Sequence, residues 1–251
     1  MKSPLRYPGG KSKAVDIITR HIPLDVNRLC SPFLGGGSIE LFCASKGIEV
    51  FGYDVFDPLV IFWNELLTNS ELLYTEIKKY HPLSTETFKE FQKNIMSETN
   101  TLKKAAMFYV INRSSFSGIT LSGGMSKNHP RFTEKSIENI LNFKIKNFNV
   151  EKMDFKDSIP KHKNDFLYLD PPYLLETNNL YGVKGNTHKD FDHQRLFELL
   201  KDRDQWIMSY NKSDIIIEMY KDFKYYIPEW SYGMSNDKTS KEIIIFSKDL
   251  T

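Results

Sequence analysis

The sequence predicts an α/β fold in which a mostly parallel sheet is interrupted by a helical lobe. Three observations support this. A strand, a glycine-rich turn, a helix and a second strand follow one another within residues 28–54. Strand patterns alternate with helical patterns again after residue 147. Residues 68–146, in contrast, show helical periodicity without strand patterns. This order is typical of a nucleotide-binding sheet that carries an insert.

Each element is predicted from its local pattern. Short apolar runs bounded by turn residues predict seven strands, at Arg28–Cys30, Glu49–Asp54, Asn147–Lys152, Phe166–Asp170, Gln205–Ser209, Tyr225–Ile227 and Glu242–Phe246. Apolar residues at helical spacing predict helices at Lys13–His21, Ser38–Lys46, Asp57–Leu67, Glu71–Tyr80, Thr85–Ile95, Thr101–Asn112, Glu134–Leu141, Asp192–Lys201 and Lys212–Tyr220. The stretch from Arg113 to Phe132 is rich in Ser, Gly and Asn and predicts a loop.

The composition excludes several classes of protein. Of the 251 residues, 40% are hydrophobic and 14% aromatic, so the chain can bury a large core and is not of a disordered class. Its longest apolar runs are strand-sized and its amino terminus is polar, so we expect no membrane span, no signal peptide and a cytoplasmic location. Two cysteines predict a reduced protein, and six histidines without paired spacing argue against a metal site.

The Asp-Pro-Pro-Tyr segment at residues 170–173 is the most informative motif. It follows a buried strand directly, and open α/β sheets bind their ligands at such strand ends. Neither proline can donate to a strand ladder, and Pro171 keeps its carbonyl as an acceptor. The Asp170 carboxylate, the Pro171 carbonyl and the Tyr173 ring can together hold a planar amine by two hydrogen bonds and a stack. The plainer alternative is a rigid turn in which Asp170 caps the next segment.

A glycine turn, Phe33-Leu-Gly35-Gly36-Gly37-Ser38, lies between the first predicted strand and helix. Glycines there let backbone amides approach a ligand at the start of the helix. A dinucleotide fingerprint would need a small residue three positions after Gly37, where Glu40 stands. A phosphate-binding loop that ends at Gly10-Lys11-Ser12 would need glycine in place of Leu5. The spacing therefore disfavours both nucleotide-binding motifs.

Asp54 ends the second predicted strand, downstream of the glycine turn. A carboxylate at this place can accept hydrogen bonds from both hydroxyls of a ribose, as acidic residues do in dinucleotide-binding folds. The alternative is that Asp54 caps the helix that begins at Asp57, a role that Asp57 itself could fill. Of the two, we favour ribose binding.

Four motifs occur in a distinctive order, namely Tyr7-Pro-Gly-Gly-Lys11, Pro32-Phe-Leu-Gly-Gly-Gly-Ser38, Asp54 at a strand end, and Asp170-Pro-Pro-Tyr173. With a helical insert before the last motif, the chain resembles the Dam-type (D12 class) DNA adenine-N6 methyltransferases over essentially its whole length. The resemblance implies a class I S-adenosylmethionine-dependent methyltransferase fold with a Rossmann-like, mostly parallel seven-stranded sheet. It also implies a catalytic domain formed by residues 1–67 and 147–251, and a helical DNA-recognition insert formed by residues 68–146.

The implied activity is site-specific methyl transfer from S-adenosylmethionine to N6 of an adenine flipped out of double-stranded DNA, directly and without a covalent enzyme intermediate. The implied catalytic residues are Asp170, Pro171, Pro172 and Tyr173. The implied cofactor-binding residues are Tyr7, Lys11, Phe33, Gly35, Gly37, Ser38, Asp54, Asp154, Phe155 and Asp170. For two of these residues the sequence leaves a plainer alternative. Lys11 could be an ordinary surface lysine, and Phe155 could be a ring that only packs in the core.

Two further segments are expected to lie near the flipped base, on which Tyr173 would stack. Residues Thr177–His188 are rich in Gly, Asn and Thr and are expected to form a loop that closes over the base. Residues Ser231–Asn236 would line the same cleft or form an ordinary hairpin.

The segment Asn112–Gly118 resembles the segment that, in this family, joins the helical insert to the DNA. Between Arg113 and Lys146 the chain has six basic and two acidic residues, which suits a polyanion but is also typical of an ordinary solvated surface. The candidate DNA-binding residues are Arg113, Ser114, Lys127, Asn128 and Arg131. After Gly118 the chain has Ile119-Thr-Leu-Ser in place of the basic-aromatic continuation of GATC readers, which puts a GATC target in doubt.

Other functions remain open from the sequence. The same chemistry on N4 of cytosine is the nearest, because an acid followed by Pro-Pro-Tyr can serve either amine. A DNA-binding relative without activity is the second. A protein glutamine methyltransferase is disfavoured, because those enzymes typically carry Asn before Pro-Pro-Tyr. We expect a monomer whose partner is double-stranded DNA, with a cognate restriction endonuclease as a further partner that the resemblance allows.

Overall fold

The fold is taken from a computed structural model, which describes residues 1–126, 131–174, 191–228 and 242–250. The expected loop Thr177–His188, the segment Ser231–Asn236 and the candidate DNA-binding residues Lys127 and Asn128 lie outside the described residues. Within the described part of the chain, no helix is both long enough and apolar enough to cross a membrane.

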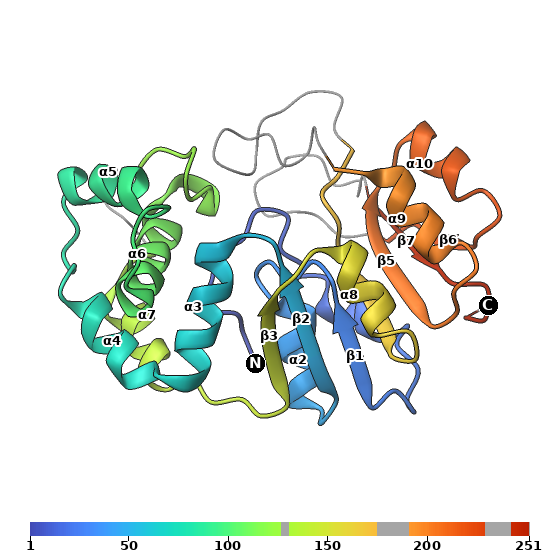
Figure 1. Cartoon of the computed structure of the whole chain (residues 1–251), viewed down its shortest axis with the longest axis horizontal. Helices are drawn as coiled ribbons and strands as arrows, with labels where there is room; N and C mark the ends of the chain where they lie inside the picture. Colours follow the sequence, from blue (N-terminus) through green and yellow to red (C-terminus); the bar gives the residue numbers. More distant parts are fainter. Residues whose placement is uncertain (127–130, 175–190, 229–241, 251) are drawn as a thin grey trace.

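Seven strands form one sheet in the order β3-β2-β1-β4-β5-β7-β6 (Figure 1). They are β1 (Arg28–Ser31), β2 (Glu49–Asp54), β3 (Phe148–Lys152), β4 (Phe166–Leu169), β5 (Trp206–Asn211), β6 (Tyr225–Tyr226) and β7 (Glu242–Phe246). The first five pair in parallel, and β7 runs antiparallel to β5 and β6. The carboxyl ends of the parallel strands therefore meet at one edge. The predicted fold class, a class I methyltransferase fold with a mostly parallel seven-stranded sheet, is confirmed.

Helices cover both faces of the sheet because successive side chains of a strand point to opposite faces (Figure 1). The helices are α1 (Val15–Thr19), α2 (Ser38–Ser45), α3 (Asp57–Thr68), α4 (Ser70–Lys78), α5 (Thr85–Asn94), α6 (Thr101–Ser114), the 3-10 helix η1 (Phe116–Gly118), α7 (Glu134–Leu141), α8 (Phe155–Lys161), α9 (His193–Leu200) and α10 (Asp214–Met219). Leu29 and Tyr168 pack with the side of the sheet covered by α2 and α3, whereas Cys30 and Leu167 pack with the side covered by α8, α9 and α10.

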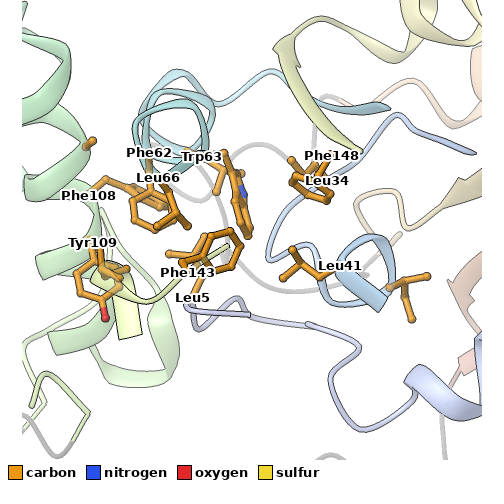
Figure 2. Close-up of a cluster of buried hydrophobic side chains, with 14 of the residues drawn as sticks. Leu5, Leu34, Leu41, Phe62, Trp63, Leu66, Phe108, Tyr109, Phe143 and Phe148 are labelled. Carbon is orange, nitrogen blue, oxygen red and sulfur yellow. The ribbon is translucent and has the colours of Figure 1, made fainter. Parts of the chain in front are cut away.

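The inserted helices share a hydrophobic core with the sheet. The ring of Phe62 in α3 stacks on that of Tyr109 in α6, with centroids 5.6 Å apart. The neighbouring Trp63 contacts Phe143, next to α7, and Phe148 of β3, with ring centroids 6.2 and 5.5 Å apart. Figure 2 shows the Trp63 ring at the centre of this cluster. The boundary that we predicted at residue 68 therefore crosses a continuous core, and the assignment of separate functions to the two parts remains a prediction.

Two segments differ from the prediction beyond small shifts at element ends. Helix α6 continues past its predicted end at Asn112 to Ser114, whereas we expected a loop to begin at Arg113. Asn112 and Ser114 are fully buried, so packing stabilises this last turn although the side chains are polar. Helix α8 was not predicted, because it has only seven residues and contains Pro160, which is typical of a loop. Asp154 caps its amino terminus by accepting a hydrogen bond from the backbone of Lys156.

Candidate active site

The predicted motifs meet at the edge where the parallel strands end. Because β2, β1 and β4 are neighbours, Asp54, the glycine turn after β1 and Asp170 all reach this edge. The amino-terminal segment reaches it as well, since Nζ of Lys11 lies 2.8 Å from the carboxylate of Asp170. These two residues are 159 positions apart in the chain. Their contact joins the first predicted motif to the last.

Lys11 and Asp170 form an ion pair with a second carboxylate beside it. The Lys11 residue is 4% exposed, and its Nζ also donates to the carbonyl of Gly9 and lies 3.6 Å from Oε1 of Glu242. The alternative of a surface lysine is therefore wrong. Burial would lower the pKa of Lys11, but the carboxylates of Asp170 and Glu242 raise it. Burial raises the pKa of Asp170 to about 6, which Lys11 opposes and Glu242 reinforces.

Asp54 holds the glycine turn. Its Oδ2 accepts a hydrogen bond from the N–H of Gly35 at 3.1 Å, and its Oδ1 accepts one from the N–H of Phe56 at 2.9 Å. Phe56 is the N-cap residue of α3, and no side chain among the described residues caps this helix, so the capping role that we weighed against ribose binding is not seen, although Asp54 binds the residue just before the helix. Gly35 and Gly37 have φ values of 46° and 64°, a conformation that favours glycine. The indole of Trp63 donates to the Gly35 carbonyl at 3.2 Å and so connects this turn to the hydrophobic core.

Tyr7 packs directly on the glycine turn. A Cβ added to Gly36 would lie 2.9 Å from Cβ of Tyr7, so a larger residue could not be accommodated there without a shift. The N–H of Gly10 donates to the Tyr7 carbonyl at 3.0 Å and closes the turn that carries Lys11. Ser38 begins α2 immediately after the glycines. The structure therefore gathers at one edge most of the predicted cofactor residues, namely Tyr7, Lys11, Gly35, Gly37, Ser38, Asp54 and Asp170.

The remaining cofactor candidates lie at the ends of β1 and β3. The ring of Phe155 is 5.6 Å from that of Phe33 and 5.1 Å from that of Phe191. Phe155 is 5% exposed, so the packing role that we considered for this ring is present in the structure. Asp154 is half-buried at the start of α8. Cofactor contacts of Phe33, Asp154 and Phe155 stay predictions.

The side chain of Tyr173 is held at both its ring and its hydroxyl. The hydroxyl donates to Oε1 of Glu242 at 2.5 Å and lies 3.4 Å from Oδ1 of Asp170. The ring stacks on that of Tyr210, with centroids 5.9 Å apart and an angle of 21°. Pro171 is buried and Pro172 is half-buried. This geometry fixes Tyr173 beside Asp170, and its expected stacking on a base remains a prediction.

The described DNA-binding candidates differ in accessibility. Arg131 is exposed, Arg113 is half-buried and Ser114 is fully buried. Because Ser114 is fully buried, its side chain is not accessible to DNA in this structure, and we no longer expect it to contact DNA. The Arg113 guanidinium donates to the carbonyl of Arg131 at 2.8 Å and to that of Pro4 at 3.3 Å. Arg113 therefore ties the end of α6 to two other segments.

Two buried acids were missed by the sequence reasoning. Glu40 is 2% exposed and accepts a hydrogen bond from the hydroxyl of Ser31 at 2.6 Å. Burial raises the pKa of Glu40 to about 7, which Ser31 opposes, and Asp170 and Lys11 are close enough to influence it. Glu242 is 3% exposed at the start of β7. The only signals were an acid where a fingerprint needs a small residue, and an acid that begins an apolar strand.

An arginine cluster and an exposed ring lie where the insert meets the amino-terminal segment. Burial, together with the charges of Arg131 and Arg113, lowers the pKa of Arg6 to about 10. Asn112 fixes the backbone of Arg6, because its Oδ1 accepts from the Arg6 N–H at 2.9 Å and its Nδ2 donates to the Arg6 carbonyl at 2.7 Å. Phe116, which begins η1, is 60% exposed. Like charges gathered in this way favour an anionic partner.

The raised pKa of Asp170 predicts that the catalytic activity of this site depends on pH. A carboxyl accepts two hydrogen bonds well only when it is ionised, and this one loses its proton at about pH 6. We therefore expect kcat/KM to rise as the pH increases toward about 6 and then to level off. Initial rates measured between about pH 5 and about pH 8 at constant ionic strength would reveal the rise. A kcat/KM that does not change across this interval would exclude a required ionised Asp170.

The sequence profile described as D12 class N6 adenine-specific DNA methyltransferase matches residues 7–234 of the chain. The chain is 26% identical over 196 residues to a DNA adenine methylase of Vibrio cholerae serotype O1, with 72% of this chain and 69% of that protein covered. It is 24% identical over 247 residues to the type II methyltransferase M1.LlaDCHI of Lactococcus lactis subsp. cremoris, with 87% and 84% covered. It is 21% identical over 256 residues to the type II methyltransferase M.CviBI of Paramecium bursaria Chlorella virus NC1A, with 97% and 96% covered.

Proposed function

Because the chain belongs to the D12 class N6 adenine-specific DNA methyltransferases, we propose that its carboxyl-edge site moves a methyl group from S-adenosylmethionine to N6 of an adenine flipped out of double-stranded DNA. The contact of Lys11 with Asp170 carries this proposal, since it joins the amino-terminal motif to the Asp-Pro-Pro-Tyr segment. The family disfavours N4 of cytosine as the acceptor. The presence of both residues in one ion pair argues against an inactive relative.

The side chains of the site suit a positively charged cofactor. Among the described residues, the carboxyls of Asp170 and Glu242 lie 2.8 and 3.6 Å from the ammonium of Lys11, and the buried carboxyl of Glu40 is close enough to interact with it. An excess of buried carboxyl groups favours a cation. S-adenosylmethionine carries a positive sulfur and supplies the methyl group when bound. Asp54 can accept further hydrogen bonds, in keeping with ribose binding. The residues that would hold the cofactor are Tyr7, Lys11, Phe33, Gly35, Gly37, Ser38, Asp54, Asp154, Phe155 and Asp170.

Asp170 and Pro171 would orient the adenine amine. The carboxylate and the carbonyl are two acceptors for the two N–H groups, and both bonds together would aim the nitrogen lone pair toward the methyl group. Such positioning can lower a barrier by several kcal/mol, and the acceptors stabilise the positive charge that develops on nitrogen. The methylated nitrogen is acidic, so it can pass its proton to Asp170, whose pKa is about 6, and from there to water. Asp170 therefore need not be a strong base.

The adenine must leave the duplex before its amine can reach these acceptors. We propose that the half-buried ring of Tyr173 stacks on the flipped base. Tyr210 and Glu242 hold this ring and its hydroxyl, so its position is set before DNA binds. A fixed stacking partner reduces the entropy lost when the base is ordered.

We place the DNA surface where residues 68–146 meet the amino-terminal segment, so that residues 1–67 and 147–251 form the catalytic domain. Arg131 and Arg6 would contact phosphates, and the exposed ring of Phe116 would stack between bases. Lys127 and Asn128 remain candidates from the sequence. Arg113 would support this DNA surface indirectly, by holding the backbone carbonyls of Arg131 and Pro4.

Replacing Arg131 by alanine is expected to weaken DNA binding about three- to tenfold, because one phosphate contact is lost. The slope of log affinity against log salt should fall by about one, while cofactor affinity is unchanged. Fluorescence anisotropy with a labelled duplex at several salt concentrations measures both. Lys46→Ala is the control, since Lys46 follows α2 at the opposite edge of the sheet. An unaltered salt slope in the Arg131 variant would contradict a phosphate contact.

The proposed reaction is tested by incubating the protein with unmethylated plasmid DNA and tritium-labelled S-adenosylmethionine. Nucleoside analysis of the digested DNA should find the label in N6-methyladenine. Label in N4-methylcytosine would show that the site methylates cytosine and not adenine. Absence of any labelled nucleoside would overturn the proposal. We further propose that the protein acts as a monomer and that it has a cognate restriction endonuclease, in keeping with the type II methyltransferases among its relatives.

A further inference from the structure

We infer that Asn211 and Glu242 form a cross-strand clamp that positions residues 170–174 for methyl transfer, an inference that rests on the proposed function. Asn211 ends β5, Glu242 begins β7, and the two are register partners in the antiparallel β5–β7 pair. Because β7 runs against the parallel strands, its first residue lies at the edge where β5 ends. Both side chains therefore reach the segment that follows β4.

The side-chain amide of Asn211 takes the place of a strand partner. Its Oδ1 accepts a hydrogen bond from the N–H of Leu174 at 3.1 Å, and its Nδ2 donates to the carbonyl of Leu174 at 2.8 Å. Pro171 and Pro172 have no N–H, so the segment cannot continue the ladder that β4 makes with β5. The Asn211 amide thus fixes the far end of the Asp-Pro-Pro-Tyr segment in the absence of a ladder.

The carboxylate of Glu242 determines where the Tyr173 hydroxyl points. A hydroxyl has one proton to donate. Oε1 of Glu242 lies 2.5 Å from it, whereas Oδ1 of Asp170 lies 3.4 Å away. Tyr173 therefore donates to Glu242, so the acceptor positions of Asp170 that Lys11 does not use are left for the substrate amine. The same oxygen of Glu242 is 3.6 Å from Nζ of Lys11, so it contacts both side chains that flank Asp170.

Stability alone does not account for a carboxylate at this place. Glu242 is 3% exposed and begins a strand whose other four residues are apolar. Removing a carboxylate from water costs free energy that a buried ion pair often fails to recover. Its charge does have a consequence at the reacting group, since it raises the pKa of Asp170. Glu242 is therefore a positioning residue that acts through Tyr173, Lys11 and Asp170.

A double-mutant cycle tests the coupling of Glu242 to Tyr173. In single-turnover assays with tritium-labelled S-adenosylmethionine and unmethylated plasmid DNA, Glu242→Ala and Tyr173→Phe should each slow transfer about tenfold. The double variant should be no more than about twofold slower than Glu242→Ala, because the Tyr173 hydroxyl has already lost this acceptor, whereas it can be slower than Tyr173→Phe because Glu242 also contacts Lys11. Equilibrium dissociation constants for cofactor and DNA should change less than about threefold. Effects that multiply in the double variant would overturn the clamp.

The pH profile gives a readout that a merely structural role would not move. Without the negative charge of Glu242, the pKa of Asp170 should fall, so Glu242→Gln should shift the rise of kcat/KM to lower pH. Glu49→Gln is the matched control. Glu49 also begins a strand, but its carboxylate binds Arg28 at 2.6 Å at the opposite edge, so this variant should keep the wild-type profile. An unshifted profile in Glu242→Gln would contradict the inference.

Asn211→Ala tests the clamp without touching the buried charge, and it decides the matter if circular dichroism shows that the Glu242 variants do not fold. We expect kcat to fall about tenfold, with KM for cofactor and DNA within about twofold of wild type. A wild-type kcat would overturn the clamp. Failure of the proposed function is distinguishable, because the wild-type protein would then form no N6-methyladenine. Failure of the clamp alone leaves the wild-type protein active.

Discussion

Replacing Asp170 by alanine is expected to abolish methyl transfer while leaving DNA binding largely intact. The substitution removes the proposed acceptor for the adenine amine, and losing one preorganised group of this kind typically slows a reaction about 10²- to 10³-fold. Lys11 also loses the carboxylate at 2.8 Å and keeps, among the described residues, the carboxylate of Glu242 at 3.6 Å and the carbonyl of Gly9 at 2.8 Å. Initial rates with labelled cofactor, together with DNA affinity from fluorescence anisotropy, measure both effects. Turnover within about tenfold of wild type would count heavily against the role of Asp170.

Asp170→Asn separates the loss of charge from the loss of the side chain. The amide keeps the shape and one acceptor oxygen but does not pair with Lys11 as an ion. Breaking a buried ion pair can cost about 3–5 kcal/mol of stability, and the nearby Glu242 should reduce this cost. Urea unfolding of both variants checks the fold independently of activity. We expect Asp170→Asn to remain folded, to bind DNA and to be strongly impaired in transfer.

Replacing Trp63 by alanine is expected to lower the free energy of unfolding by about 3–5 kcal/mol. The Trp63 side chain is fully buried at the centre of the cluster in Figure 2, where it contacts both Phe143 and Phe148. Its removal leaves a cavity between the inserted helices and the sheet, and the surrounding rings can fill it only partly. Urea denaturation followed by circular dichroism measures the loss. A loss below about 1 kcal/mol would show that the two parts do not depend on this shared core.

Trp63→Phe tests whether this core also supports the cofactor site. The smaller ring stays buried, but the indole N–H that binds the Gly35 carbonyl is gone, so cofactor affinity should fall along with stability. The matched control is Trp206→Phe. Trp206 is also fully buried, but it packs on the side of the sheet covered by α8, α9 and α10, and its indole donates to the carbonyls of Leu200 and Arg203. It should lose stability with unchanged cofactor affinity, and equal effects on affinity would contradict the connection through Gly35.

Patterns confined to neighbouring residues were sufficient for most of the fold. The strands around Leu29 and Leu167, for example, were predicted because apolar runs between turn residues need no distant partner to be recognised. Helix α8 was missed because seven residues with Pro160 are too short for a period to emerge. The burial of Ser114 could not be predicted, since serine is mostly exposed in folded proteins and its place at a helix end gives no sign of packing.

The sequence by itself determined the type of sheet, the helical insert and the strand-end residues Asp54 and Asp170, because local periodicity and turn residues specify these features. Only the tertiary structure decided which charges share a buried space. Glu242 and Lys11 are far apart in the chain, and an acid before an apolar strand is not informative until the antiparallel β7 brings it to the site. Burial and the distance between charges set the pKa of Asp170, and both depend on segments that meet only in the folded chain.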